Sequence, residues 1–212
     1  MADDDHLILA ELLCARVCHD LSGPVGAVGT GAELLTEESD GLDADALALL
    51  ASSAAIAGQR LRFLRLALGP GGAAVAGPQL REVTAAFLAG AAAASEAVRL
   101  DWEDGGSTAW ENAAAKLLLN LVLLARDCLP RGGAILVRAR LPGQPWASVV
   151  AEGQGAVSGE AMAGLTAGID DLEPRSAQGY YAAGLASRLG LTIRASVASG
   201  RIELNIGDSL HS

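Results

Sequence analysis

A histidine and a carboxylate stand side by side at His19 and Asp20, and Pro24 follows the histidine by five residues. A neutral imidazole is a competent nucleophile near pH 7, and an adjacent carboxylate can fix which ring nitrogen carries the proton. Arg16 and Ser22 can engage an anionic group by charge or by hydrogen bonding, although a solvated surface role is an equal alternative for each. The pattern indicates a nucleophilic histidine oriented by an acid.

The residues around His19 belong to a long predicted helix. Apolar residues recur at alternating spacings of four and three, as in a stripe that faces a partner helix. The stripe consists of Cys14, Cys18, Leu21, Val25, Val28, Ala32 and Leu35. His19 directly follows a stripe residue, so we expect it to face outward with Gly23, Gly26 and Thr30 on the same exposed face. Glycine weakens a helix, so helix stability does not explain the glycines on this face. We expect that the smooth face lets a docking partner approach closely.

A second helix is predicted between the break and N-cap signals at Gly41 and Asp43 and the stop at Gly69 and Pro70. Its apolar stripe consists of Leu47, Leu50, Ala54, Ala57, Leu61, Leu64 and Leu68. The two helices predict an antiparallel hairpin domain over residues 1–72. A lone hairpin buries only one stripe of each helix, so we expect two chains to pair as a homodimeric four-helix bundle.

The second half, residues 73–212, has a different pattern. Helices are predicted at residues 79–94 and 110–129, and strands are predicted near residues 98–102, 134–141, 147–151, 192–197 and 202–206. This order predicts an α/β sandwich. The whole chain is therefore expected to be an α+β protein of two domains.

The string from Arg16 to Pro24 resembles the phospho-acceptor box of two-component signalling proteins, and residues 11–35 are similar to the ChpT-type histidine phosphotransferases. The resemblance implies a phosphorelay enzyme in which His19 accepts a phosphoryl group from the receiver domain of a hybrid histidine kinase. His19 then passes the group to response-regulator receivers, including a cell-cycle transcription regulator and a small single-domain receiver. Asp20 orients the ring first and acts as a general base second.

The residues expected to face a docking partner follow from their positions on the helix relative to His19. They are Arg16, Ser22, Gly23, Gly26 and Thr30. The magnesium ion that neutralises the phosphoryl oxygens is expected in the receiver, so this chain supplies no metal site and no cofactor site. Many related kinases carry Asn or Thr four residues after the histidine to position a hydrolytic water. Gly23 stands there, which predicts transfer without dedicated phosphatase activity.

The second half resembles the ATP-binding domain of histidine kinases with its nucleotide site lost. The magnesium-binding asparagine of the N box falls at Leu124, and the aspartate that recognises adenine falls at Ala151, unless Glu152 substitutes from a shifted register. The glycine-rich lid is reduced to residues 178–184, with few backbone N–H groups for phosphates. We expect neither ATP binding nor autokinase activity, and Asn120 is expected to bond within the fold.

Composition limits the partners and the compartment. The formal charge of −10 with a single lysine argues against nucleic acid, which binds clusters of basic side chains. No apolar run reaches the length of about 18 residues needed to cross a bilayer, and the first residues lack a basic secretion signal. Three cysteines indicate reduced thiols, so we expect a cytoplasmic protein with Cys14 and Cys18 packed in the helical core.

Three other interpretations compete with the phosphorelay enzyme. A dimeric scaffold that binds receivers without chemistry would share the smooth face and would not need His19. A true histidine kinase with an unusual nucleotide site is disfavoured by Leu124 and Ala151. A thiol or metal sensor would use Cys14 and Cys18 and would carry stoichiometric zinc.

Overall fold

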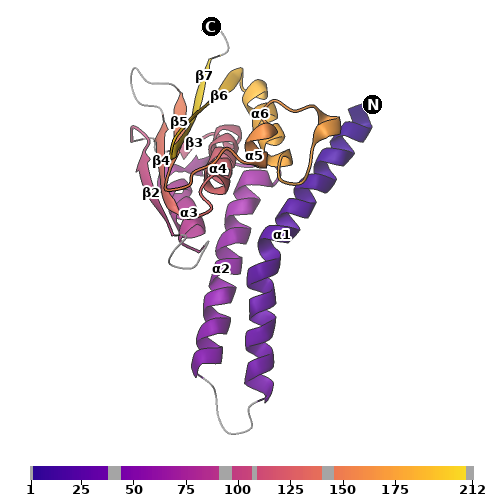
Figure 1. Cartoon of the computed structure of the whole chain (residues 1–212), viewed down its shortest axis with the longest axis vertical. Coiled ribbons are helices and arrows are strands. Elements are labelled where there is room, and N and C mark those ends of the chain that lie inside the picture. Colours follow the sequence, from indigo (N-terminus) through magenta and orange to yellow (C-terminus); the bar gives the residue numbers. More distant parts are fainter. Residues whose placement is uncertain (1, 38–43, 91–96, 107–108, 140–145, 209–212) are drawn as a thin grey trace.

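The computed structural model describes residues 2–37, 44–90, 97–106, 109–139 and 146–208. Its first two helices, α1 (Ala2–Glu37) and α2 (Ala44–Leu68), run side by side as a long hairpin, and an α/β unit sits against its open end (Figure 1). The expected α+β class and the hairpin are thereby confirmed. The turn signals at Gly41 and Asp43 lie outside the described residues.

The α/β unit is built on a five-stranded sheet in the order β2-β4-β5-β7-β6, in which only β2 and β4 are parallel neighbours. The strands are β2 (Val98–Glu103), β4 (Gly133–Ala139), β5 (Ala147–Glu152), β6 (Leu191–Ala198) and β7 (Arg201–Asp208). A separate two-stranded ribbon joins β1 (Val75–Ala76) to β3 (Ala109–Trp110). The helices are α3 (Gly77–Ala89), α4 (Asn112–Asp127), α5 (Glu160–Ala163), the 3₁₀ helix η2 (Ile169–Asp171) and α6 (Ala177–Arg188).

All five predicted strands are confirmed within the described residues, and the predicted helices differ at their ends. The helix expected at residues 110–129 begins at Asn112, because Trp110 instead pairs with Val75 in the small ribbon and is fully buried. The first helix begins at Ala2, well before the apolar stripe. Acidic residues at its start, such as Asp4 and Asp5, favour a helix N-terminus.

The core is centred on α4, which lies between the sheet and the hairpin (Figure 1). Every residue of positions 114–125 is buried, as expected for a helix that is apolar on all sides. The base of the hairpin belongs to the same core, where Phe63 of α2 stacks on Phe87 of α3 with ring centroids 4.1 Å apart. The base of the hairpin is thus packed into the core of the α/β unit, and the division at residue 72 stays a prediction.

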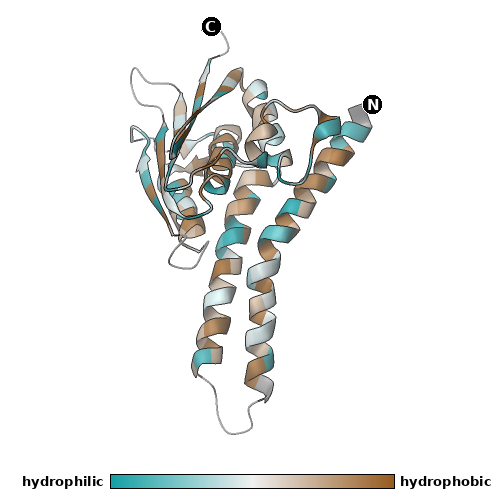
Figure 2. Cartoon of the chain, viewed as in Figure 1, coloured by the Kyte–Doolittle hydropathy of each residue, from teal (hydrophilic) through white to brown (hydrophobic). Residues whose placement is uncertain are grey.

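The prediction of which apolar residues of the two hairpin helices are buried is partly wrong. Cys14, Cys18 and Val25 of α1 are exposed, and so are Leu47 and Leu61 of α2. Figure 2 shows apolar positions along the length of both helices, not on one side alone. Each helix carries two adjacent apolar stripes, and the one used within the hairpin lies beside the one that spacing selected. The expected burial of the two cysteines is therefore wrong for the single chain.

The two helices pack closely at Gly31. A Cβ atom there would lie 3.1 Å from the Cβ atom of Leu50 and 3.3 Å from its backbone N and Cα atoms, whereas a Cβ atom at Gly29 would meet nothing within 4 Å. Among the described glycines of α1, Gly31 is therefore the one whose missing side chain serves the packing of the hairpin.

This difference gives a paired prediction. Gly29→Ala is expected to raise the free energy of unfolding by about 0.5–1 kcal/mol, because alanine loses less backbone entropy in a helix. Gly31→Ala gains the same propensity but must push α2 away, so its gain is expected to be cancelled. Urea unfolding of both variants, followed by circular dichroism, measures the difference. Equal stabilisation by the two changes would contradict the close approach.

In the part of the chain that the structure describes, no helix combines the length and apolar character that crossing a membrane requires.

Candidate functional site

His19 lies on the outside of α1, and its side chain is 77% exposed. Its Nδ1 atom is 3.3 Å from Oδ1 of Asp20. A carboxylate only accepts hydrogen bonds, so this contact requires the proton on Nδ1. In the neutral ring, Nε2 then carries the lone pair. The roles of His19 as nucleophile and of Asp20 as the acid that orients it stay predictions.

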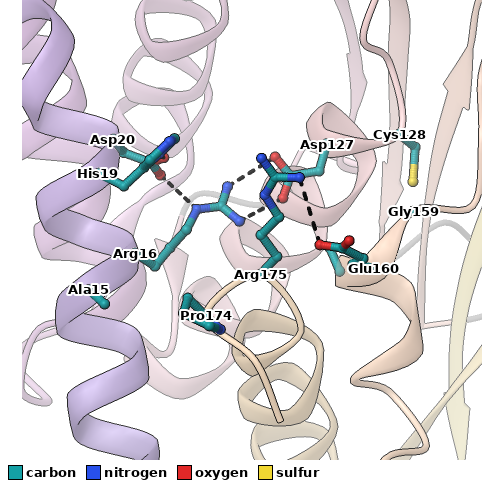
Figure 3. A pocket seen from close by; sticks show the side chains of 11 residues that line it. Ala15, Arg16, His19, Asp20, Asp127, Cys128, Gly159, Glu160, Pro174 and Arg175 are labelled. Atoms are coloured by element: carbon teal, nitrogen blue, oxygen red, sulfur yellow. Dashed lines mark hydrogen bonds and ion pairs between the residues drawn. The ribbon is translucent and has the colours of Figure 1, made fainter.

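Asp20 is held in turn by Arg16, which lies one turn earlier on α1. Arg16 Nε donates to Oδ2 of Asp20 at 3.0 Å, and its two terminal nitrogens each donate to an oxygen of Asp127 at 2.9 Å (Figure 3). The Arg16 side chain is only 11% exposed. Burial by itself lowers the pKa of Arg16, but the hydrogen bonds and charge of Asp127, and then of Asp20, outweigh it and raise that pKa above its usual value.

Arg16 is predicted to contact a docking partner, and in the structure its guanidinium is engaged within the chain. All three of its donor groups that face the site are occupied by carboxylates of the chain itself. Its guanidinium bridges the hairpin and the α/β unit. Direct contact with a receiver stays a prediction, and the observed contacts are internal.

The backbone of Asp20 is held from the second helix of the hairpin. Pro24 has no N–H group, so the carbonyl oxygen of Asp20 loses its helical donor. Arg60 of α2 fills that place, since its Nη1 atom donates to this oxygen at 2.5 Å. The proline thus marks the point where the hairpin is cross-linked beneath His19, and α1 continues through it.

A cleft of about 650 Å³ opens beside His19, between α1, the end of α4, the start of α5 and the segment before α6. Its polar lining residues are Arg16, His19, Asp20, Asp127, Glu160 and Arg175. Figure 3 shows Arg175 and Glu160 facing the α1 residues across this space, and these two form an exposed ion pair at 3.7 Å. Two elements of the second domain therefore flank the histidine.

The other predicted partner-facing residues form an open face. Side-chain atoms added at Gly23 or Gly26 would meet nothing within 4 Å. The hydroxyls of Ser22 and Thr30 are turned onto their own helix, where they donate to the carbonyls of Cys18 at 2.6 Å and of Gly26 at 3.3 Å. The face is smooth, and its use by a partner stays a prediction.

Sequence reasoning missed Asp127, Arg60, Glu160 and Arg175. Asp127 had a usable signal, because it is an acid in the last turn of a predicted helix, where the helix dipole disfavours negative charge. Such a residue requires a cation from elsewhere in the fold. Nothing in the local sequence around the other three pointed to the site.

Residues 81–201, more than half of the chain, match the family described as the histidine phosphotransferase C-terminal domain. The chain belongs to this histidine phosphotransferase family. Protein phosphotransferase ChpT of Brucella abortus (strain 2308) is 37% identical over 151 residues, which are 62% of this chain and 61% of that relative. A solved structure described as a bacterial phosphotransferase superposes with a TM-score of 0.78 at 29% identity, covering 94% of this chain and 96% of that chain.

The sequence comparison with kinase nucleotide sites singled out two positions on this unit. Leu124 and Ala151 are both fully buried. Asn120 donates to the carbonyls of Lys116 and of Ala67 in α2, and its side-chain oxygen accepts from Gln178, so the prediction that it bonds within the fold is confirmed. Residues 178–184 lie inside α6, and from Tyr180 onward their backbone N–H groups are used by the helix itself.

The cysteines of the chain do not form a site with one another. Cys14 and Cys18 are exposed on α1, and Cys128 is buried at the end of α4. Burial raises the pKa of the Cys128 thiol to about 11, so this thiol stays protonated at neutral pH. Among the described residues, no group of three or more His, Cys, Asp or Glu side chains is arranged to hold a metal ion.

Proposed function

We propose that this chain is a phosphorelay histidine phosphotransferase, in which His19 accepts a phosphoryl group from a receiver phospho-aspartate and returns it to a second receiver. One observation carries the proposal. In a member of the histidine phosphotransferase family, an exposed imidazole donates from Nδ1 to a fixed carboxylate and keeps Nε2 free.

The transfer step follows from this geometry. The Nε2 lone pair attacks the phosphorus atom, the bond between phosphorus and the receiver carboxylate oxygen breaks, and the electron pair leaves with that carboxylate. The proton on Nδ1 stays in place, so the phosphorylated ring carries a positive charge beside Asp20. The carboxylate stabilises that charge and lowers the barrier. Reversal of the same step on another receiver regenerates the neutral ring.

The partners and the metal follow from the same reaction. The donor is the receiver domain of a hybrid histidine kinase, and the acceptors are response-regulator receivers of a cell-cycle signalling system. The magnesium ion that screens the phosphoryl oxygens is supplied by the acidic pocket of the receiver, and this chain adds no metal ligand and no cofactor. The reaction takes place in the cytoplasm, where the exposed Cys14 and Cys18 remain reduced.

The chain has no autokinase activity in this proposal. A hard cation requires oxygen ligands, and the buried Leu124 offers none at the N-box position. Ala151 likewise offers no carboxylate to an adenine amino group. Titration with magnesium-ATP is expected to show no saturable binding, and binding at millimolar or lower concentration would revive the kinase alternative.

The active form is a homodimer. Exposed apolar side chains on both hairpin helices give a second copy a surface to cover. They are Val25, Leu34, Leu47, Leu49 and Leu61. Light scattering is expected to give twice the chain mass of 21.4 kDa, and a monomer at micromolar concentration would contradict the pairing.

Hydrolysis of receiver phosphate is not part of the activity. Gly23, four residues after His19, presents no side chain and therefore cannot position a water. Receiver dephosphorylation that requires this face would contradict this part of the proposal.

Incubation with a phosphorylated receiver distinguishes the phosphotransferase function from the alternative of a receiver-binding scaffold. The enzyme gains radiolabelled phosphate while the receiver loses it. A scaffold binds the receiver and gains no label, and this outcome would replace the transfer proposal with the binding one.

A further inference from the structure

Arg16 connects two carboxylates that come from opposite halves of the chain. Asp20 is four residues away on the same helix, whereas Asp127 is 111 residues away at the end of α4. The side chains of Arg16, Asp20 and Asp127 are 11%, 18% and 29% exposed, so the cluster is largely shielded from water. Contacts of this kind are screened less than surface ion pairs.

The cluster also forms a wall between two cavities. On one side lies the cleft beside His19, and on the other lies a smaller cavity of about 170 Å³. Arg16, Asp20 and Asp127 line both spaces. The inner cavity is bordered as well by Arg60, which is engaged by the Asp20 carbonyl. The cluster therefore sits directly beside the histidine, between the two cavities.

Charge balance makes Asp127 necessary to this arrangement. Without it, a buried guanidinium would have one carboxylate, and its two terminal nitrogens would lose their acceptors. Arg16 would then be free to turn toward Asp20 with a different nitrogen or toward the solvent. The planar guanidinium of Arg16 has three nitrogens engaged. It therefore holds Oδ2 of Asp20, the oxygen that does not contact His19. The other oxygen, Oδ1, is thereby left for Nδ1 of the imidazole.

We propose that Asp127, acting through Arg16, is a positioning residue for phosphoryl transfer: it holds the Asp20 carboxylate so that His19 keeps its proton on Nδ1 and its lone pair on Nε2. The role rests on the proposed phosphotransferase function. It also makes the α/β unit a direct contributor to the chemistry of the hairpin, beyond its packing.

Two substitutions test the proposal. Asp127→Asn keeps the size of the side chain and removes its charge and one acceptor oxygen. Arg16→Lys keeps a positive charge and removes the planar fork. The matched control is Glu103→Gln, which removes the carboxylate of the exposed ion pair with Arg138 in the sheet.

Three measurements are made on each variant. The ¹⁵N chemical shifts of the His19 ring in the unphosphorylated protein report which nitrogen is protonated. The rate of transfer from a phosphorylated receiver reports the chemistry, and receiver affinity with urea unfolding reports docking and stability.

Asp127→Asn and Arg16→Lys are expected to increase the fraction of His19 protonated on Nε2 and to slow transfer by about 10-fold, the effect typical of a group that orients an active histidine. The receiver affinity of Asp127→Asn is expected to stay unchanged. Glu103→Gln is expected to behave as the wild type in every measurement.

An unchanged tautomer in both variants would overturn the positioning role, whatever happens to the rate. A slower transfer that merely follows a loss of stability would overturn it too. If the wild type accepts no phosphate, the proposed function fails, and the ring nitrogen shifts still decide whether Asp127 orients His19.

Discussion

His19→Gln is expected to lower phosphate acceptance from a receiver by more than about 1,000-fold, as removal of a nucleophile does in other covalent enzymes. Glutamine has no ring nitrogen that can form the bond to phosphorus, and no other described histidine lies in the cleft. The change costs little stability, because the side chain is mostly exposed and its one hydrogen bond among the described residues is with Asp20. Radiolabel transferred in a fixed time measures the effect.

The matched control is His6→Gln, which removes another exposed histidine from the same helix. This variant is expected to accept phosphate at the wild-type rate. Receiver binding, measured by calorimetry, is expected to be the same for both variants. Label on His19→Gln at the wild-type rate would place the acceptor elsewhere in the chain.

Asp20→Asn is expected to slow transfer by about 100-fold, within the range typical of a lost acid–base or orienting group. The asparagine amide keeps the size of the side chain but loses the charge that stabilises the phosphorylated, positively charged ring. It also leaves Arg16 with a single carboxylate, Asp127, in place of two. Single-turnover transfer from a phosphorylated receiver measures the rate apart from binding.

The control for this change is Glu11→Gln, which neutralises an exposed acid on the same helix. It is expected to leave the transfer rate unchanged, so a general effect of charge on docking can be told from the local one. A wild-type rate for Asp20→Asn would mean that the carboxylate contact at Nδ1 has no part in the reaction.

The loss of transfer rate is expected to be largest for the change at His19, smaller for Asp20 and smallest for Asp127. His19 forms the bond, Asp20 contacts the ring, and Asp127 acts only through Arg16. Losses that decrease in this order would reflect increasing distance from the reacting nitrogen. A larger loss at Asp127 than at Asp20 would instead indicate a structural role for the link between the hairpin and the α/β unit.

Local patterns were sufficient to predict the hairpin helices, the five strands of the sheet and the exposure of His19, whereas the ribbon of β1 and β3 and the short helices α5 and η2 were not predicted. The sheet strands are short apolar runs with turn signals between them, and each was found near its expected position. The histidine is exposed as expected, even though its neighbour Cys18 is exposed as well. The predicted stripes were partly wrong because each hairpin helix has two adjacent apolar stripes. Spacing alone does not tell which of the two packs against the other helix of the hairpin.

The supports of the site could not be predicted in the same way. Arg60 meets the Asp20 carbonyl across the hairpin, and Asp127 meets Arg16 across the fold, so neither contact has a local spacing. Pro24 indicates that the carbonyl oxygen of Asp20 lacks its helical N–H donor, but it does not indicate which group donates instead. Asp127 at the end of α4 indicates that a cationic side chain lies nearby, but it does not identify that side chain. Only the packing of α4 against the hairpin brings these groups together.

The most direct test of the account is the chemical nature of the bond formed on the wild-type chain after incubation with a radiolabelled phospho-receiver. The account predicts an acid-labile, alkali-stable label on a single site, mapped by NMR to Nε2 of His19. An alkali-labile label on a carboxylate, or a receiver that binds and keeps its phosphate, would contradict it.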